Sequence, residues 1–193
     1  MSQAGYGLPV PGRACGSCML CCKVPGIKES DLSPGEHDIK KPPGVWCRHA
    51  VKGSGCAVYA DRPSVCRRFY CHWMLTPGLG PEWKPDKARF VLYGDPTARK
   101  VIDIAVDPAF PNAWMKPPYR ETIMRWAAAA AADNCFVLIQ IGQRNLAVVT
   151  DRVIDLGTMG PEDVVTVARG PEGLVVKVIS PPKIGSTTNA RPD

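Results

Sequence analysis

The chain has 193 residues, of which 45% are hydrophobic and 22% are charged, a composition that suits one large or two small domains with a real core. Its longest strictly apolar run, residues 126–132, is too short to cross a bilayer, and residues 1–11 lack the continuous apolar segment of a signal peptide. These features exclude a helical membrane anchor and predict a cytoplasmic protein that makes no contact with a membrane.

The net charge of +6 lies mainly in the first part of the chain. Residues 1–75 contain ten Lys and Arg against five Asp and Glu, whereas residues 76–193 contain 14 against 13. Such an excess could bind the phosphates of a nucleic acid. We favour a local role instead, since several arginines lie near cysteines and can offset the charge of thiolates. These are Arg48, Arg62, Arg67 and Arg68.

A CxxCxxCC run opens the cysteine-rich part of the chain. Its members are Cys15, Cys18, Cys21 and Cys22. Gly16 permits a tight knuckle between the first two cysteines. If the chain then turns helical, Cys18 and Cys22 fall one turn apart on the same face. Because adjacent cysteines do not easily share one small ion, Cys21 or Cys22 would ligate a second centre, remain a reserve thiol or simply pack.

Four further cysteines follow at wider spacing. They are Cys47, Cys56, Cys66 and Cys71. The turn residues 52–55 predict a hairpin that presents Cys47 and Cys56 together. Asp61 can cap a short helix with Arg62 and Pro63 in its first turn, from which Cys66 and Cys71 project about one and a half turns apart.

The second half of the chain is ordinary globular sequence. Residues 76–87 are rich in Pro and Gly and predict a linker between a cysteine-cluster region, residues 1–75, and an α+β region, residues 88–180. Residues 181–193 predict a flexible tail. The expected elements of the α+β region are strands 90–93 and 101–106 around a turn at 94–96, a main helix 119–132, and two hairpins built from 136–141 with 146–150 and from 164–168 with 174–179.

The predicted fold class is therefore α+β. We expect an irregular cysteine-rich metal-binding region with short helices and a hairpin, followed by a small, mostly antiparallel sheet with one main helix.

Eight cysteines at this density in a reducing compartment favour a metal or cluster site over disulfides. The candidate ligands are Cys15, Cys18, Cys21, Cys22, Cys47, Cys56, Cys66 and Cys71. Zinc takes four ligands in a closed tetrahedron, so eight thiolates could make two sites. An iron–sulfur cluster of the 4Fe-4S type also takes four cysteines, and the first three have the CxxCxxC spacing, although the Cys-Pro ending of bacterial ferredoxins is missing. Both interpretations stay open.

Three other residues are weaker candidates. His49 and His72 each lie within two residues of a cysteine and could replace a thiolate or support one by a hydrogen bond. Cys135 opens an apolar stretch and is expected to be a buried free thiol rather than a ligand. The common catalytic fingerprints are absent, so no catalytic residue is predicted and it stays open whether the chain is an enzyme.

The cysteine pattern and its surroundings resemble the YkgJ-type cysteine-cluster family over about the first 75 residues. The residues that carry the resemblance are the CxxCxxCC run, Tyr59, Arg62, Pro63, Cys66, Arg67, Phe69 and Cys71. The resemblance implies chelation of zinc or iron. Related domains occur in flagellin lysine N-methylases, where an iron–sulfur centre is linked to methyl transfer, but no segment for a methyl donor or for flagellin is recognisable here.

The sequence thus predicts a cytosolic metal-binding protein that holds a thiolate-ligated iron–sulfur cluster or zinc, with a redox or group-transfer role. The alternative is a zinc-stapled adaptor that binds nucleic acid or a protein partner. Nucleic acid is the less expected of these, and the sequence does not identify a protein partner.

Overall fold

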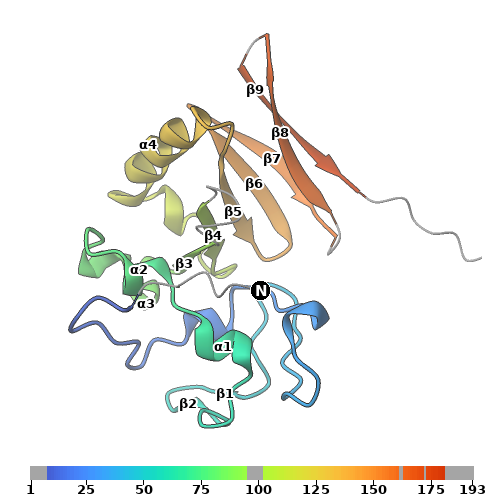
Figure 1. Ribbon diagram of the computed structural model, residues 1–193. Helices are drawn as coiled ribbons and strands as arrows, with labels where there is room; N and C mark the ends of the chain where they lie inside the picture. Colours follow the sequence, from blue (N-terminus) through green and yellow to red (C-terminus); the bar gives the residue numbers. More distant parts are fainter. Residues whose placement is uncertain (1–7, 95–101, 161–162, 172, 181–193) are drawn as a thin grey trace, which may run out of the picture.

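The computed structural model of the protein describes residues 8–94, 102–160, 163–171 and 173–180. Figure 1 shows a cysteine-rich part built from loops and short elements, next to a β-sheet with one long helix and a separate hairpin. In the described residues, no helix is both long and apolar enough to span a bilayer.

The cysteine-rich part has little regular structure because Gly, Pro and short polar stretches interrupt it. Its elements are η1 (Leu20–Cys22), η2 (Glu29–Asp31), β1 (Ala50–Val51), β2 (Gly55–Cys56), α1 (Ser64–Arg68) and α2 (His72–Leu75). Strands β1 and β2 pair antiparallel, which confirms the hairpin expected around residues 52–55.

A five-stranded mixed sheet forms the centre of the molecule, with the strand order β3-β4-β5-β6-β7. The strands are β3 (Phe90–Tyr93), β4 (Ile102–Val106), β5 (Val137–Ile141), β6 (Arg144–Val149) and β7 (Arg152–Thr158). Only the pair β4–β5 among these described strands is parallel. A parallel pair needs a crossover, which contains η4 (Ala113–Met115) and α4 (Tyr119–Ala131).

Helix α4 covers one face of the sheet, as Figure 1 shows. Ile123 and Ala127 on this helix are fully buried against strand residues that alternate along β3 to β6. The strand residues that share this core are Phe90, Leu92, Ile104, Val106, Val137, Ile139, Leu146 and Val148. This is the main core of the protein.

The opposite face of the sheet is shared by two other parts of the chain. Val91 of β3 and Ala105 of β4 pack against the cysteine-rich part. Ala147 and Val149 of β6 pack against Val165, which lies in the hairpin β8–β9. The hairpin consists of β8 (Val164–Gly170) and β9 (Gly173–Ile179). The cysteine region is therefore attached to the β3–β4 side of the sheet.

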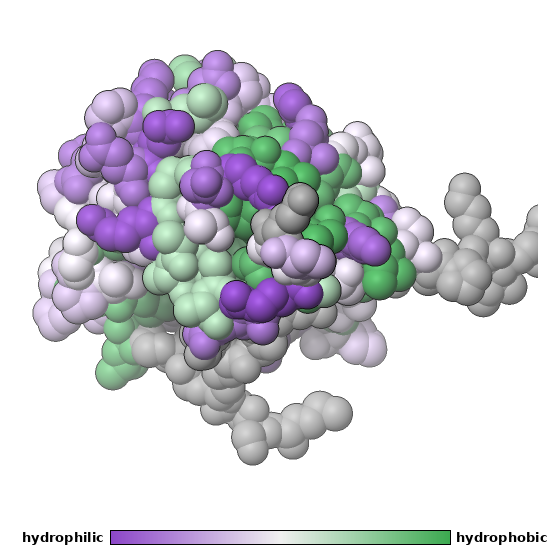
Figure 2. Space-filling model, turned by 90° about the horizontal axis from the view of Figure 1, so that it is seen from above, coloured by the Kyte–Doolittle hydropathy of each residue, from purple (hydrophilic) through white to green (hydrophobic). Residues whose placement is uncertain are grey.

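The hairpin end of the molecule leaves some apolar side chains at the surface. They are Val153, Val164, Val175 and Ile179. Figure 2 looks onto the molecule from above and shows hydrophobic residues gathered on the visible face.

The structure confirms the α+β class, the single main helix and a mostly antiparallel sheet. Strand β7 was not predicted, and neither was the parallel pairing of β4 with β5. Residues 76–87, the predicted linker, contain η3 (Pro81–Trp83) and the start of α3 (Pro85–Ala88). Trp83 is buried there and packs edge-on against Phe90 and Tyr119.

The helix predicted to carry Cys66 begins later in the chain than expected. Pro63 precedes the first residue of α1, and Asp61 does not cap it. The cap is supplied from a distant loop, because Glu36 Oε1 accepts the backbone N–H of Ser64 at 2.7 Å. The predicted tail 181–193 and the residues 95–96 of the predicted turn lie outside the described residues.

Candidate metal centre

All nine cysteines are described, and each carries a free thiol. The charges of the eight cysteines in the first part of the chain act on one another in two sets of four, which are joined by the interaction between Cys21 and Cys22. The first cysteine group is Cys15, Cys18, Cys21 and Cys71. The second cysteine group is Cys22, Cys47, Cys56 and Cys66. Each group draws on separate segments of the chain.

The first cysteine group lies against the sheet. Cys18, Cys21 and Cys71 belong to the apolar cluster that covers Val91 of β3 and Ala105 of β4, whereas Cys15 is exposed. The knuckle between Cys15 and Cys18 closes through the Cys18 N–H, which donates to the Cys15 carbonyl at 3.0 Å. Gly16 has a φ of +56° in this knuckle, a conformation that favours glycine.

Backbone N–H groups point at two sulfurs of the first cysteine group. The N–H groups of Leu20 and Asp86 donate to Cys18, and those of Trp73 and Met74 donate to Cys71. Burial nevertheless raises the pKa of both thiols, and that of Cys71 reaches about 11. Such N–H donors stabilise a thiolate, so these buried sulfurs are suited to binding a cation that displaces their protons.

The second cysteine group is assembled from η1, the β1–β2 hairpin and α1. The N–H of Cys47 donates to the carbonyl of Cys22 at 2.8 Å, which joins the hairpin to η1. Burial raises the pKa of Cys66 to about 11, and the charges of Cys22, Cys47 and Cys56 add to this shift. Cys66 thus lies within electrostatic range of the other three thiols.

The adjacent residues Cys21 and Cys22 belong to different groups. The Cys21 thiol donates a hydrogen bond to Cys22, which lowers the pKa of Cys22 to about 7 and raises that of Cys21 well above its ordinary value. Lys41 and Arg62 further favour the Cys22 thiolate. The two groups are therefore electrically coupled at this point of the backbone.

Lys41 is the buried cation of this region, and sequence reasoning missed it. Its side chain is 7% exposed, and Nζ donates to the carbonyl of Lys23 at 2.9 Å and to the carbonyl of Pro25. Burial lowers the pKa of Lys41, and the charges of four cysteines oppose this shift. They are Cys47, Cys22, Cys21 and Cys66. A fixed ammonium group here balances thiolate charge.

Of the arginines expected to balance the thiolates, Arg62 acts on cysteines, whereas Arg48 and Arg67 pair with carboxylates. The charge of Arg62 acts on Cys22 and Cys66, and its guanidinium stacks on Tyr59 at 3.8 Å. Arg48 instead pairs with Asp38 at 3.7 Å, and Arg67 lies 3.9 Å from Glu36. For Arg68 the structure shows no contact with a cysteine among the described residues.

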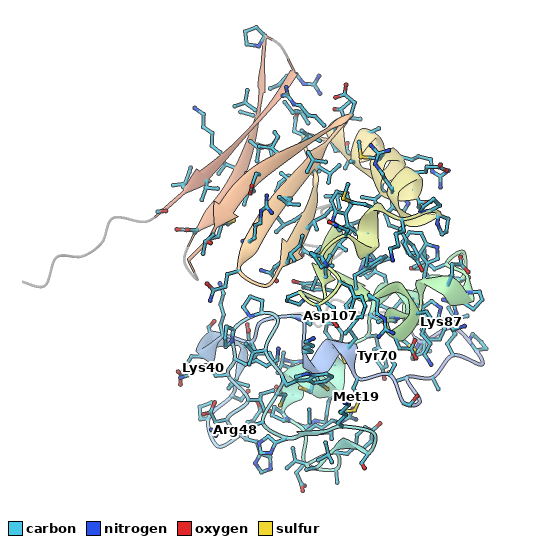
Figure 3. All side chains as sticks on the ribbon, turned by 180° about the vertical axis from the view of Figure 1, so that it is seen from behind. Met19, Lys40, Arg48, Tyr70, Lys87 and Asp107 are labelled. Atoms are coloured by element: carbon cyan, nitrogen blue, oxygen red, sulfur yellow. The ribbon has the colours of Figure 1, made fainter. Side chains whose placement is uncertain are left out.

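Two charged side chains, Arg13 and Lys23, join the cysteine-rich part to later segments of the chain. The guanidinium of Arg13 donates to the carbonyls of Thr76 at 2.8 Å and Leu79 at 2.6 Å, and it also reaches the carbonyl of Trp73. Lys23 Nζ lies 2.5 Å from Asp107 Oδ1 at the end of β4. Figure 3 shows Asp107 between the sheet and the region marked by Met19 and Tyr70.

The three weaker candidates, His49, His72 and Cys135, make contacts of other kinds. The ring of His72 donates to the backbone of Gly94, and burial lowers its pKa. The ring of His49 stands 5.5 Å from that of His37. Cys135 is half-buried and donates to the carbonyl of Asp133 at 3.4 Å.

As the side chains stand, no three Cys, His, Asp or Glu residues in the described part of the chain converge tightly enough to form a coordination sphere. Binding would therefore require the thiol side chains of a group to turn inward. The described residues do leave one buried side-chain oxygen without a hydrogen-bond partner, Asp86 Oδ1, and Asp86 also interacts with Cys18.

Sequence reasoning missed Asp86 because it lies in the predicted linker, where nothing in the spacing relates it to a cysteine. Comparison of the chain with family models, with curated proteins and with solved structures finds no match.

Proposed function

We propose that this protein is a metal-binding protein that holds zinc or an iron–sulfur cluster through cysteine thiolates. The single observation that carries the proposal is the division of eight cysteines, which come from distant segments, into two groups of four. Four is the number of thiolates that a closed zinc site or a 4Fe-4S cluster takes. A packing role for the cysteines gives no reason for this number.

The surroundings of both groups support the proposal. Backbone N–H groups serve the sulfurs of Cys18 and Cys71, while Lys41 and Arg62 supply positive charge to the second cysteine group. Thiolates at such a site need both, since a group of four carries more negative charge than a divalent ion neutralises. The nine free thiols are also consistent with a reducing compartment, which in our proposal is the cytoplasm.

The two kinds of metal group would serve the protein differently. Zinc held by four thiolates supplies a folding staple, whereas an iron–sulfur cluster supplies electron transfer or a site for group transfer. In either case the chain itself positions the sulfurs, excludes water from Cys71 with the apolar residues of the sheet face, and balances their charge.

A second candidate function is a zinc-stapled adaptor that binds a protein partner. It is favoured by apolar side chains that remain exposed near the β1–β2 hairpin of the second cysteine group. They are Val45, Trp46, Val51 and Tyr59, each at least 46% exposed. Aromatic residues exposed in this way are typical of contact surfaces.

Metal and sulfide analysis of the full chain after anaerobic purification tests the proposal. Stoichiometric iron with acid-labile sulfide and a broad visible absorption would establish a cluster, and colourless protein with stoichiometric zinc would establish the staple. Protein that holds neither metal in any preparation would contradict the proposal.

A further inference from the structure

Residues 8–18, here called the strap, lead into the CxxCxxCC run across the surface of the protein. None of these residues is buried, and Leu8 is 90% exposed. The strap therefore adds little to the apolar core, and its attachment depends on hydrogen bonds. Segments that bury few apolar groups open locally at a much lower free energy than a core does.

A tight turn in the strap presents two hydrogen-bond donors to the segment that follows Cys71. The N–H of Arg13 donates to the carbonyl of Val10 at 3.0 Å, and Gly12 at the centre of the turn has a φ of +79°. Pro11 followed by a glycine with positive φ is typical of a type II turn. The turn sets the spacing between Val10 and Arg13, which both bind helix α2.

Arg13 and Val10 supply donors that helix α2 lacks at its C-terminal end. The carbonyl of Trp73 would accept the N–H four residues later in a continuing helix, but Pro77 stands there and has none. The Arg13 guanidinium donates to the Trp73 carbonyl instead, and the Val10 N–H donates to the Met74 carbonyl at 2.8 Å. The guanidinium also donates to three carbonyls of the next loop, those of Thr76 at 2.8 Å, Pro77 at 3.1 Å and Leu79 at 2.6 Å.

The strap also holds the surroundings of the Cys71 thiol. Met74, whose carbonyl binds Val10, donates its own N–H to the carbonyl of Cys71 at 2.8 Å. Cys18, the last residue of the strap, packs in the same apolar cluster as Cys71, which is 8% exposed. Release of the strap would therefore loosen α2 and withdraw Cys18 from the Cys71 thiol.

We propose that the strap is a gate, fastened by Arg13, that controls access from solvent to Cys71 and thereby to the first cysteine group. The structure shows the closed state. In the open state the bonds of Arg13 are broken while the core between the sheet and α4 stays folded. The inference goes beyond the proposed function, because it concerns access to the thiol and holds for the metal-free chain.

Alkylation of the metal-free, reduced full chain by iodoacetamide at one fixed pH tests the gate. Trypsin releases Cys71 in a peptide of residues 69–87 that contains no other cysteine, so mass spectrometry follows this thiol by itself. In Arg13→Gln we expect Cys71 to react about tenfold faster or more than in the wild type, because losing several hydrogen bonds increases the open population. Arg120→Gln, the same substitution at an exposed arginine of α4, is the matched control and should react as the wild type does.

Two further measurements separate opening of the strap from general unfolding. Cys135, recovered in the tryptic peptide 126–144, is the internal reference and should keep its wild-type rate in every variant. Gly12→Ala keeps the guanidinium but strains the turn, since the φ of +79° disfavours a side chain although the space beside Gly12 is open. We expect it to give a Cys71 rate between those of the wild type and Arg13→Gln, and it decides the question if Arg13→Gln does not fold. Wild-type rates at Cys71 in both variants, or an increase that Cys135 matches, would overturn the gate.

Discussion

Cys21 and Cys22 are neighbours in the chain and share a hydrogen bond, and beyond this bond they interact with different sets of thiols. The charges of Cys18 and Cys15 act on Cys21, whereas the charge of Cys22 acts on Cys66. Because the two thiols share this hydrogen bond, the short helix η1 is the place where the two sets of thiols meet. The CxxCxxCC run thus contributes Cys15, Cys18 and Cys21 to the first cysteine group and Cys22 to the second.

The raised pKa values of buried thiols predict how the metal-free protein responds to alkali. Burial raises the pKa of Cys66 and of Cys71 from the ordinary thiol value of 9.0 to about 11. Between these values the unfolded chain has lost protons that the folded chain retains, so stability falls as pH rises. We expect the Tm of metal-free, reduced protein to fall between about pH 9 and about pH 11.

The control for this prediction is the double variant Cys66→Ser/Cys71→Ser, which lacks both groups and should show a smaller fall. An equal fall in Tm for wild type and double variant would show that these thiols are not responsible.

Lys41 makes a second prediction at the level of single residues. In Lys41→Met the carbonyls of Lys23 and Pro25 lose their donor in a buried place, so we expect unfolding to cost about 1–3 kcal/mol less than in the wild type. Lys40→Met is the matched control, because Lys40 is exposed and pairs with the exposed Glu29; it should change stability by less than about 0.5 kcal/mol. Denaturant unfolding measures both. Equal stability of the two variants would contradict a structural role for Lys41.

At the level of elements, the helix α1 that carries Cys66 depends on a cap from outside its own segment. Glu36 accepts N–H bonds from Ser33 and Ser64, and these bonds lower its pKa. A lowered carboxyl pKa contributes stability above the ordinary carboxyl range and loses it as pH falls through the folded value.

We therefore expect Glu36→Gln to lower the Tm at about pH 7 and to differ less from the wild type at about pH 3. Thermal unfolding at both values checks this, with Glu29→Gln, an exposed carboxylate, as the control. A difference between Glu36→Gln and wild type that is the same at both values would argue against the charged cap.

The elements that local patterns specify were predicted, and those that depend on distant contacts were not. The helix α4 and the hairpin β5–β6 follow from periodicity and turn residues. Strand β7 was missed because Asp155 and Gly157 interrupt its apolar pattern, and it is held by pairing with β6. The parallel β4–β5 pair depends on the crossover through α4, which spacing alone does not reveal.

The candidate site shows the same limit. The eight cysteines could be named from the sequence, but not their division, because Cys66 and Cys71 were expected to project from one helix. In the structure α1 ends at Arg68 and Cys71 precedes α2. Cys66 therefore belongs to the second cysteine group and Cys71 to the first. Lys41 and Asp86 were missed for the same reason, since only the fold brings them to the cysteines.

At the level of the whole molecule, the sheet supports the candidate site. The β3–β4 side of one face packs against the half-buried Cys18 and Cys21 and the buried Cys71, and the Lys23–Asp107 pair joins the residue after η1 to the end of β4. The second half of the chain thereby acts as a platform that holds the first cysteine group against an apolar wall.

The central proposal is that the eight cysteines form two separate metal centres. Its most direct test is the metal content of anaerobically purified wild type, Cys18→Ser, Cys66→Ser and the double variant, measured by elemental analysis. The account predicts that each single variant loses the metal of one centre and that the double variant loses all of it. Single variants that retain all of the wild-type metal, or that each lose all of it while still folded, would contradict the division into two centres.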